Sequence, residues 1–129
     1  MSRRLIQIAV AIAGLVPVGA GAAGVLLGAA MIPLTGSMPI SADSHWRYLS
    51  GLLLGIGLAF WSLIPRIESQ GRLFQTLTGI VVAGGLGRLW ALMAVGIPDK
   101  AMMFGLTMEL VVTPVLAIWQ YRLARGSKK

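Results

Sequence analysis

The sequence predicts an all-α integral membrane protein, an antiparallel bundle of four transmembrane helices in a single membrane domain of residues 1–129. Hydrophobic residues make up 57% of the chain and charged residues only 12%, about half the share usual in soluble domains. The apolar residues form four runs, at about residues 5–31, 46–64, 73–95 and 101–121. About 20 residues of helix cross the hydrocarbon core of a bilayer, so each run can span it. Lipid is therefore the expected solvent.

The first run, residues 5–31, is predicted to be a helix with one smooth face. Glycines and one proline recur at intervals of three and four, which places them on one side of a helix: Gly14, Pro17, Gly21, Gly24 and Gly28. In lipid, such faces let helices approach closely. We therefore expect this face to pack against another helix.

Two other interpretations fit parts of this run. A secretory signal peptide would explain Arg3 and Arg4 before an apolar stretch, but the stretch continues to Met31, beyond a usual signal core. Residues 19–24, GAGAAG, also match the dinucleotide-binding pattern, with Asp43 about twenty residues later. That pattern acts only between a strand and a helix, and no strand pattern follows it. Helix packing is the preferred interpretation of these glycines.

The second and third runs also carry small residues at helical spacing. Gly51 and Gly55 form a G-x-x-x-G pair in the second run, and Gly79, Ala83 and Gly87 follow at steps of four in the third. This spacing predicts further helix contacts. The same faces would serve a structural or accessory subunit that docks on copies of itself or on another membrane protein.

Prolines interrupt the first and fourth runs. Pro17 and Pro114 each lack a backbone donor, which leaves the carbonyls of Ala13 and Leu110 without their usual helical partners. We therefore expect an irregular, polar backbone about one turn from Glu109.

Basic residues are distributed unequally between the ends of the runs. Of 11 Lys and Arg, eight lie at the two termini and in the connection at residues 65–72, whereas Arg47 and Lys100 lie at the opposite ends. This bias predicts that both termini are cytoplasmic, with the chain in an inner membrane. The basic residues do not form a nucleic-acid-binding face, so nucleic acid is not an expected partner.

Arg88 and Glu109 are the ionisable residues inside the apolar runs. A loop of five residues, 96–100, joins their helices. Arg88 lies eight residues before Gly96 and Glu109 eight residues after Ala101, so both fall roughly 12 Å from the same helix ends. An unpaired charge at this depth costs about 2.5 to 3.5 kcal/mol, which predicts an ion pair that faces the bundle interior. Gly84 and Gly85 would leave room for the guanidinium. A direct, a diagonal and a water-bridged pair all stay open, because the two side chains lean in opposite directions.

The pair either fixes helix register or lines a site. Arg47 and Tyr48 enter the second helix from the same predicted side, and Arg47 has only Asp43 as a local partner. With Arg88 and Glu109 they would form a cationic cleft for an anionic, lipid-like small molecule. Arg47 could equally extend to lipid phosphates.

Enzymatic and proton-coupled roles receive the least support. The chain has no cysteine and one histidine, His45, which we expect to be solvated in a polar loop. We therefore predict no catalytic residues, metal ligands or cofactor, and membrane lipids as the expected partners.

Several short motifs resemble a known family. They are RYLSGLLLGIGL in the second run, GGLGRL in the third, GIP after it, and Glu109 with Pro114 in the fourth. Together they are similar to a family of small bacterial four-span membrane proteins classed as a domain of unknown function. The resemblance covers nearly the whole chain and implies a four-helix inner-membrane protein, without a known activity, ligand or cofactor. By this resemblance the recurring family positions are Arg47, Gly51, Gly87, Arg88 and Glu109.

Overall fold

The computed structural model describes residues 2–32, 36 and 38–128; Lys129 of the predicted basic tail and part of the first predicted loop lie outside them. Within the described residues the secondary structure is helical and there is no strand. Four helices are long and apolar enough to span a membrane: Arg3–Met31, Ile40–Arg66, Gly71–Ala94 and Lys100–Gly126. The predicted all-α class with four transmembrane helices is confirmed, which indicates a membrane protein.

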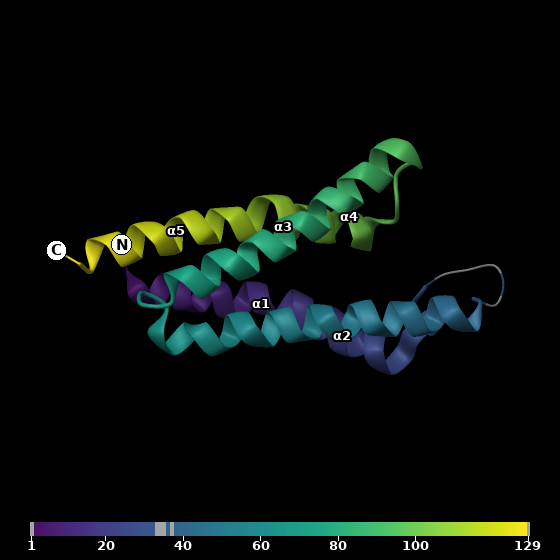
Figure 1. The fold of residues 1–129 in the computed structure, drawn as a ribbon, viewed down its shortest axis with the longest axis horizontal. Helices are drawn as coiled ribbons and strands as arrows, with labels where there is room; N and C mark the ends of the chain where they lie inside the picture. Colours follow the sequence, from purple (N-terminus) through teal and green to yellow (C-terminus); the bar gives the residue numbers. More distant parts are fainter. Residues whose placement is uncertain (1, 33–35, 37, 129) are drawn as a thin grey trace. The chain divides into compact units, whose positions relative to one another are not determined.

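Eight helical elements follow one another along the chain (Figure 1). They are α1 (Arg3–Leu27), η1 (Gly28–Met31), α2 (Ile40–Leu63), η2 (Ile64–Arg66), α3 (Gly71–Ala94), α4 (Lys100–Thr107), η3 (Met108–Val112) and α5 (Thr113–Gly126). They divide into two compact units. The first unit comprises Met1–Ala13 and Leu63–Lys129, and the second comprises Gly14–Ser62.

In the second unit, α1 and α2 pack antiparallel through the predicted glycine face of α1. A methyl group added to Gly14 would meet the Trp61 ring, one added to Gly21 would lie 2.5 Å from the Leu54 backbone nitrogen, and one added to Gly24 would meet Ser50. The partner residue number falls as the glycine number rises, which is the signature of antiparallel helices. Close approach of the two backbones therefore depends on the absence of side chains at these glycines.

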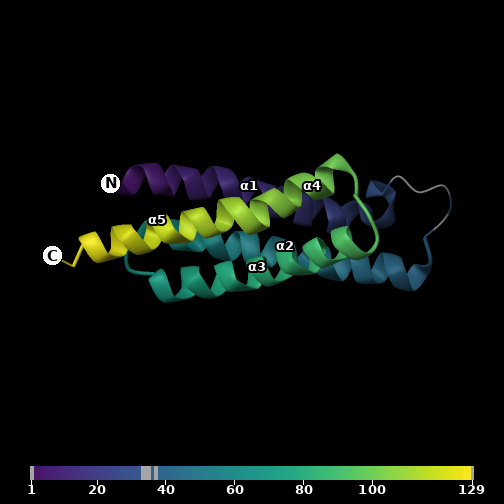
Figure 2. The same cartoon turned by 90° about the horizontal axis from the view of Figure 1, so that it is seen from above.

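In the first unit, α3 runs antiparallel to the α4, η3 and α5 segment (Figure 2). At one end Gln75 Nε2 donates to the Ala117 carbonyl at 3.0 Å, and at the other Arg88 contacts Glu109. Side chains from the start of α1, the last residue of α2, the loop after η2, and α3 contribute to the core of this unit: Ile6, Val10, Leu63, Ile67, Phe74 and Leu77. Both chain ends lie at the same end of this unit (Figures 1 and 2).

The predicted small faces of α2 and α3 make few contacts. A methyl group at Gly51 would touch only Val25, at 3.8 Å, and one at Gly55, Gly79 or Gly87 would meet nothing within 4 Å. Ala83 is exposed as well. The close contacts use Gly57 in α2, which faces Pro17 and Val18, and Gly85 in α3, neither of which the spacing singled out. Several faces of α2 and α3 carry small residues, and spacing alone does not identify the packed one.

The fourth span is not a regular α-helix. Residues Met108–Val112 form a π-helical turn directly before Pro114, as the missing donor of that proline predicts. The Met108 carbonyl accepts from the Thr113 backbone N–H across the wider turn, and the Thr113 hydroxyl donates to it as well, at 2.8 Å. The irregular backbone contains Glu109 itself.

Candidate functional site

Arg88 and Glu109 lie in direct contact in the first unit. Arg88 Nε is 3.0 Å from Glu109 Oε1, and Arg88 Nη1 donates to Met102 Sδ at 2.9 Å. The contact uses the guanidinium nitrogen nearest the backbone rather than the end of the side chain. Helices α3 and η3 therefore approach closely enough that no water bridge is needed.

Gly85 permits this approach, and Gly105 lies at ordinary contact distance from Arg88. A methyl group at Gly85 would lie 2.7 Å from Leu110 Cδ2 and 2.9 Å from Glu109 Cβ, and one at Gly105 would lie 3.9 Å from Arg88 Cζ. Gly85, predicted to make room for the guanidinium, instead receives the η3 side chains. It lies one helical turn before Arg88, which brings the carboxylate alongside the arginine.

Part of each charged group remains unused. Among the described residues, Arg88 Nη2 has no hydrogen-bond partner, and Glu109 Oε2 is buried without one. The exposed fraction is 38% for the Arg88 side chain and 16% for the Glu109 side chain. A buried polar atom without a partner is uncommon in folded proteins and marks places where water, a proton or a ligand acts. The site thus combines donors and an acceptor that the fold does not saturate.

Arg47 is engaged elsewhere, at the C-terminal end of α1 in the second unit. Its Nη1 donates to the carbonyls of Val25 at 2.7 Å and Leu26 at 3.3 Å, and its Nε lies 2.9 Å from Asp43 Oδ2. Asp43 Oδ1 in turn accepts from the Ala29 amide at 2.7 Å. Free carbonyls and the negative dipole end attract cations to a helix C-terminus. Arg47 therefore caps the C-terminal end of α1, a role that the sequence did not predict.

Tyr48 and His45 lie on the exposed first turns of α2. Their rings stack with centroids 6.3 Å apart, and 62% of Tyr48 is exposed. Helix α2 begins at Ile40, earlier than the predicted boundary near residue 46, because Asp43 and Arg47 hold its polar start against α1. The described residues contain no group of three or more potential metal ligands.

Three glutamine amides in the first unit were not identified from the sequence. Gln7, Gln75 and Gln120 donate to the carbonyls of Ile64, Ala117 and Ile67, at 2.7, 3.0 and 2.8 Å respectively. Gln120 is fully buried. These amides satisfy backbone carbonyls at and near the loop end of the unit. The sequence signal that could have identified them is a single glutamine within an otherwise apolar stretch.

Comparison with known proteins identifies a family for the chain. The model of a family described as a domain of unknown function, DUF4345, matches residues 5–120 of the chain. No curated protein and no solved structure matches the chain. The family match contains all four spans almost in full, together with the charged residues of both sites. The chain therefore belongs to the DUF4345 family of domains of unknown function, which confirms the resemblance that its short motifs suggested.

Proposed function

We propose that the chain is a membrane-embedded binding protein for a lipid-like, amphipathic small molecule with an anionic headgroup. The observation that carries this proposal is the incompletely used Arg88 guanidinium beside Glu109. An intramembrane arginine that served only to neutralise one glutamate would need no exposed guanidinium nitrogen without a partner. Here Nη2 is free, and the Met102 thioether on Nη1 is a weak acceptor that a phosphate or carboxylate oxygen would replace.

Charge balance narrows the class of headgroup. Glu109 already offsets the charge of Arg88, so a bound phosphate or carboxylate would leave net negative charge in the membrane. A headgroup that also carries an ammonium or a hydroxyl donor avoids this cost. We therefore favour phosphate-containing headgroups that are zwitterionic or hydroxylated. The proposal does not use Arg47, because its guanidinium caps the C-terminal end of α1.

Native mass spectrometry after gentle detergent extraction tests the proposal. The wild-type chain should carry a co-purifying lipid-like adduct that the Arg88→Ala variant loses. Arg72→Ala removes an exposed arginine from the same helix, one whose side chain has no partner among the described residues, and should keep the adduct. Identical adduct-free spectra for wild type and Arg88→Ala would contradict the proposal. Circular dichroism of each variant distinguishes ligand loss from loss of helix.

A second candidate function is that of an accessory subunit in a membrane complex. It is favoured by the unoccupied small face of α3, where Gly79, Ala83 and Gly87 are exposed over successive turns. Replacing Gly79 and Gly87 by leucine should abolish a crosslinked complex, with itself or with another membrane protein, and leave the monomer helical. Unchanged crosslinking would remove this candidate.

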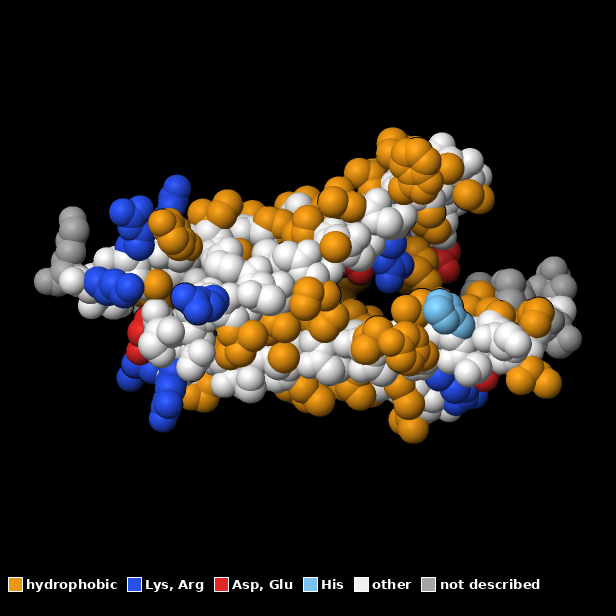
Figure 3. Space-filling view, in the orientation of Figure 1, with side chains coloured by type: hydrophobic (Ala, Val, Ile, Leu, Met, Phe, Trp, Pro, Cys, Tyr) orange, Lys and Arg blue, Asp and Glu red, His pale blue; other side chains and the backbone are white. Residues whose placement is uncertain are grey.

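The location that we propose is a bacterial inner membrane with both termini in the cytoplasm. Support comes from the basic residues at the end of the first unit that holds both termini (Figure 3). The chain has no native cysteine, so single cysteines report sidedness directly. In intact cells an impermeant maleimide should label Ser44→Cys and not Ser127→Cys. The reverse pattern would invert the topology.

A further inference from the structure

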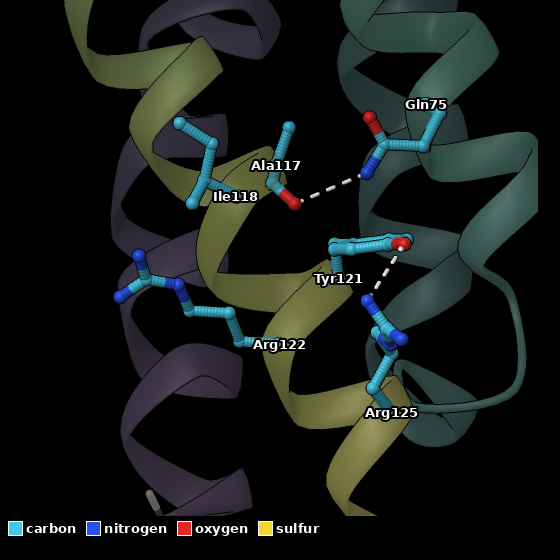
Figure 4. A pocket seen from close by; sticks show the side chains of 6 residues that line it. All are labelled: Gln75, Ala117, Ile118, Tyr121, Arg122 and Arg125. Carbon is cyan, nitrogen blue, oxygen red and sulfur yellow. Dashed lines mark hydrogen bonds between the residues drawn. The ribbon is translucent and has the colours of Figure 1, made fainter.

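A groove at the basic end of the first unit runs along one face of α5. It has a volume of about 500 Å³ and is lined by Gln75, Ala117, Ile118, Tyr121, Arg122 and Arg125 (Figure 4). The α5 residues recur one helical turn apart, so the lining changes from apolar at Ala117 and Ile118 to aromatic at Tyr121 and cationic beyond it. This change takes place over about 12 Å of helix. Apolar and cationic surfaces thus adjoin within one groove.

The two arginines of the groove are available in different ways. The Arg125 guanidinium carbon lies 5.5 Å from the centroid of the Tyr121 ring, and its Nη1 donates to the Tyr121 hydroxyl at 3.4 Å. This contact holds the guanidinium in place while leaving most of its donors free. Among the described residues, Arg122 makes no hydrogen bond or ion pair. The Arg125 guanidinium therefore presents unused donors beside Tyr121, whereas the Arg122 guanidinium extends from the opposite side of α5 (Figure 4).

The surroundings add positive charge without neutralising it. Basic side chains gather at this end of the first unit, at the left of Figure 3, and the described ones are Arg3, Arg4, Arg66, Arg72, Arg122, Arg125 and Lys128. Glu68 is the acidic residue here, and its Oε2 lies 3.0 Å from Arg3 Nε. Arg3 thus forms an ion pair with this carboxylate, and no side-chain carboxylate of the described residues forms an ion pair with the groove arginines.

We propose that this groove binds the headgroup of an anionic phospholipid. Tyrosine is enriched at the membrane–water interface, so Tyr121 places the groove at headgroup depth, where Ile118 and Ala117 would face the upper acyl chains. Basic pockets between transmembrane helices suit anionic headgroups, because guanidinium forks match phosphate oxygens. This site is separate from Arg88 and Glu109, and either proposal can fail without the other.

The test uses delipidated full-length protein and native mass spectrometry with added phosphatidylglycerol or phosphatidylcholine of identical acyl chains. Wild type should bind phosphatidylglycerol in preference to phosphatidylcholine. Arg122→Gln/Arg125→Gln should weaken phosphatidylglycerol binding about 25-fold, at about fivefold for each basic residue near a headgroup. Phosphatidylcholine binding should change little, because it depends on the apolar lining.

A matched control separates this groove from general surface charge. Arg4→Gln/Arg66→Gln removes the same charge from the same end of the unit but leaves the groove intact, and its phosphatidylglycerol affinity should stay near that of wild type. An equal loss in both double variants would overturn the proposal, as would equal binding of the two lipids by wild type. Displacement of the lipid by excess inorganic phosphate would also overturn it, since the phosphate group alone would then account for binding. Arg122→Lys/Arg125→Lys keeps the charge and should restore most of the affinity, which excludes misfolding as the cause of the loss.

Discussion

Gly85 lies against Glu109, so that α3 and the π-helical turn approach most closely one helical turn before Arg88. A Cβ at this position would lie 2.9 Å from Glu109 Cβ, closer than side chains normally pack. The absence of a side chain at Gly85 therefore determines whether the carboxylate can reach Arg88 Nε. The ion pair depends on a neutral residue as much as on the two charged ones.

We expect Gly85→Leu to destabilise the chain by about 1 to 3 kcal/mol, because overpacking forces the neighbouring helix outward. The free energy of unfolding would be measured by titrating mixed micelles with sodium dodecyl sulfate. Gly84→Leu is the matched control, since a methyl group at Gly84 meets nothing within 4 Å. Equal stability of the two variants would show that Gly85 does not set the helix separation.

The charges should be energetically coupled. Arg88→Met leaves Glu109 unpaired and Glu109→Gln leaves Arg88 unpaired, and each should cost about 2 to 3 kcal/mol in a membrane. The double variant should lose less than the sum of the two, with a coupling of about 0.5 to 3 kcal/mol, as expected for residues in contact. The same unfolding titration measures all four chains. Additive losses would indicate that the two groups do not stabilise one another.

Hydropathy and loop length made much of this arrangement predictable. Four spans follow from four apolar runs, and the short connection between the third and fourth spans places Arg88 and Glu109 at matching depth. The sequence does not distinguish a direct contact from a diagonal or water-bridged pair, because the Cβ directions of the two residues differ. The direct contact results from the small separation between α3 and η3. That separation depends on Gly85 and on the π-helical turn rather than on the depth of the two charges in the membrane.

The environment of Arg47 could not be inferred in the same way. Its acceptors are the backbone carbonyls of Val25 and Leu26, which every residue possesses and which therefore leave no sequence signature. The packed faces of α2 and α3 were ambiguous for a related reason. Gly79 and Gly87 share helical spacing with small neighbours, and Gly85, between them in sequence, makes the close contact.

Gly28→Ala should destabilise the end of α1. Gly28 has a φ of 56°, which costs an L-residue about 1 to 2 kcal/mol, and its added methyl group would meet Arg47 and Asp43. Gly19→Ala is the control, because Gly19 lies in the same span, Arg3–Met31, with open space around it. Hydrogen exchange of the Ala29 amide, which donates to Asp43, would report the change locally. Unaltered protection of that amide in Gly28→Ala would contradict the proposed role of Arg47 and Asp43.

Deletion of one residue should be tolerated in η3 and not in α5. A π-helical turn contains one residue more than the α-helical turn that it replaces, so deleting Val111 can restore a regular helix without rotating the segments on either side. Deleting Ile118 instead rotates every later residue by about 100° and removes Gln120 from the Ile67 carbonyl. Val111 and Ile118 are each 55% exposed, so neither deletion removes a core side chain. We expect the Val111 deletion to retain most of the unfolding free energy and the Ile118 deletion to lose the folded state. Equal losses of unfolding free energy in the two deletion variants would mean that the π-helical turn does not contain a surplus residue.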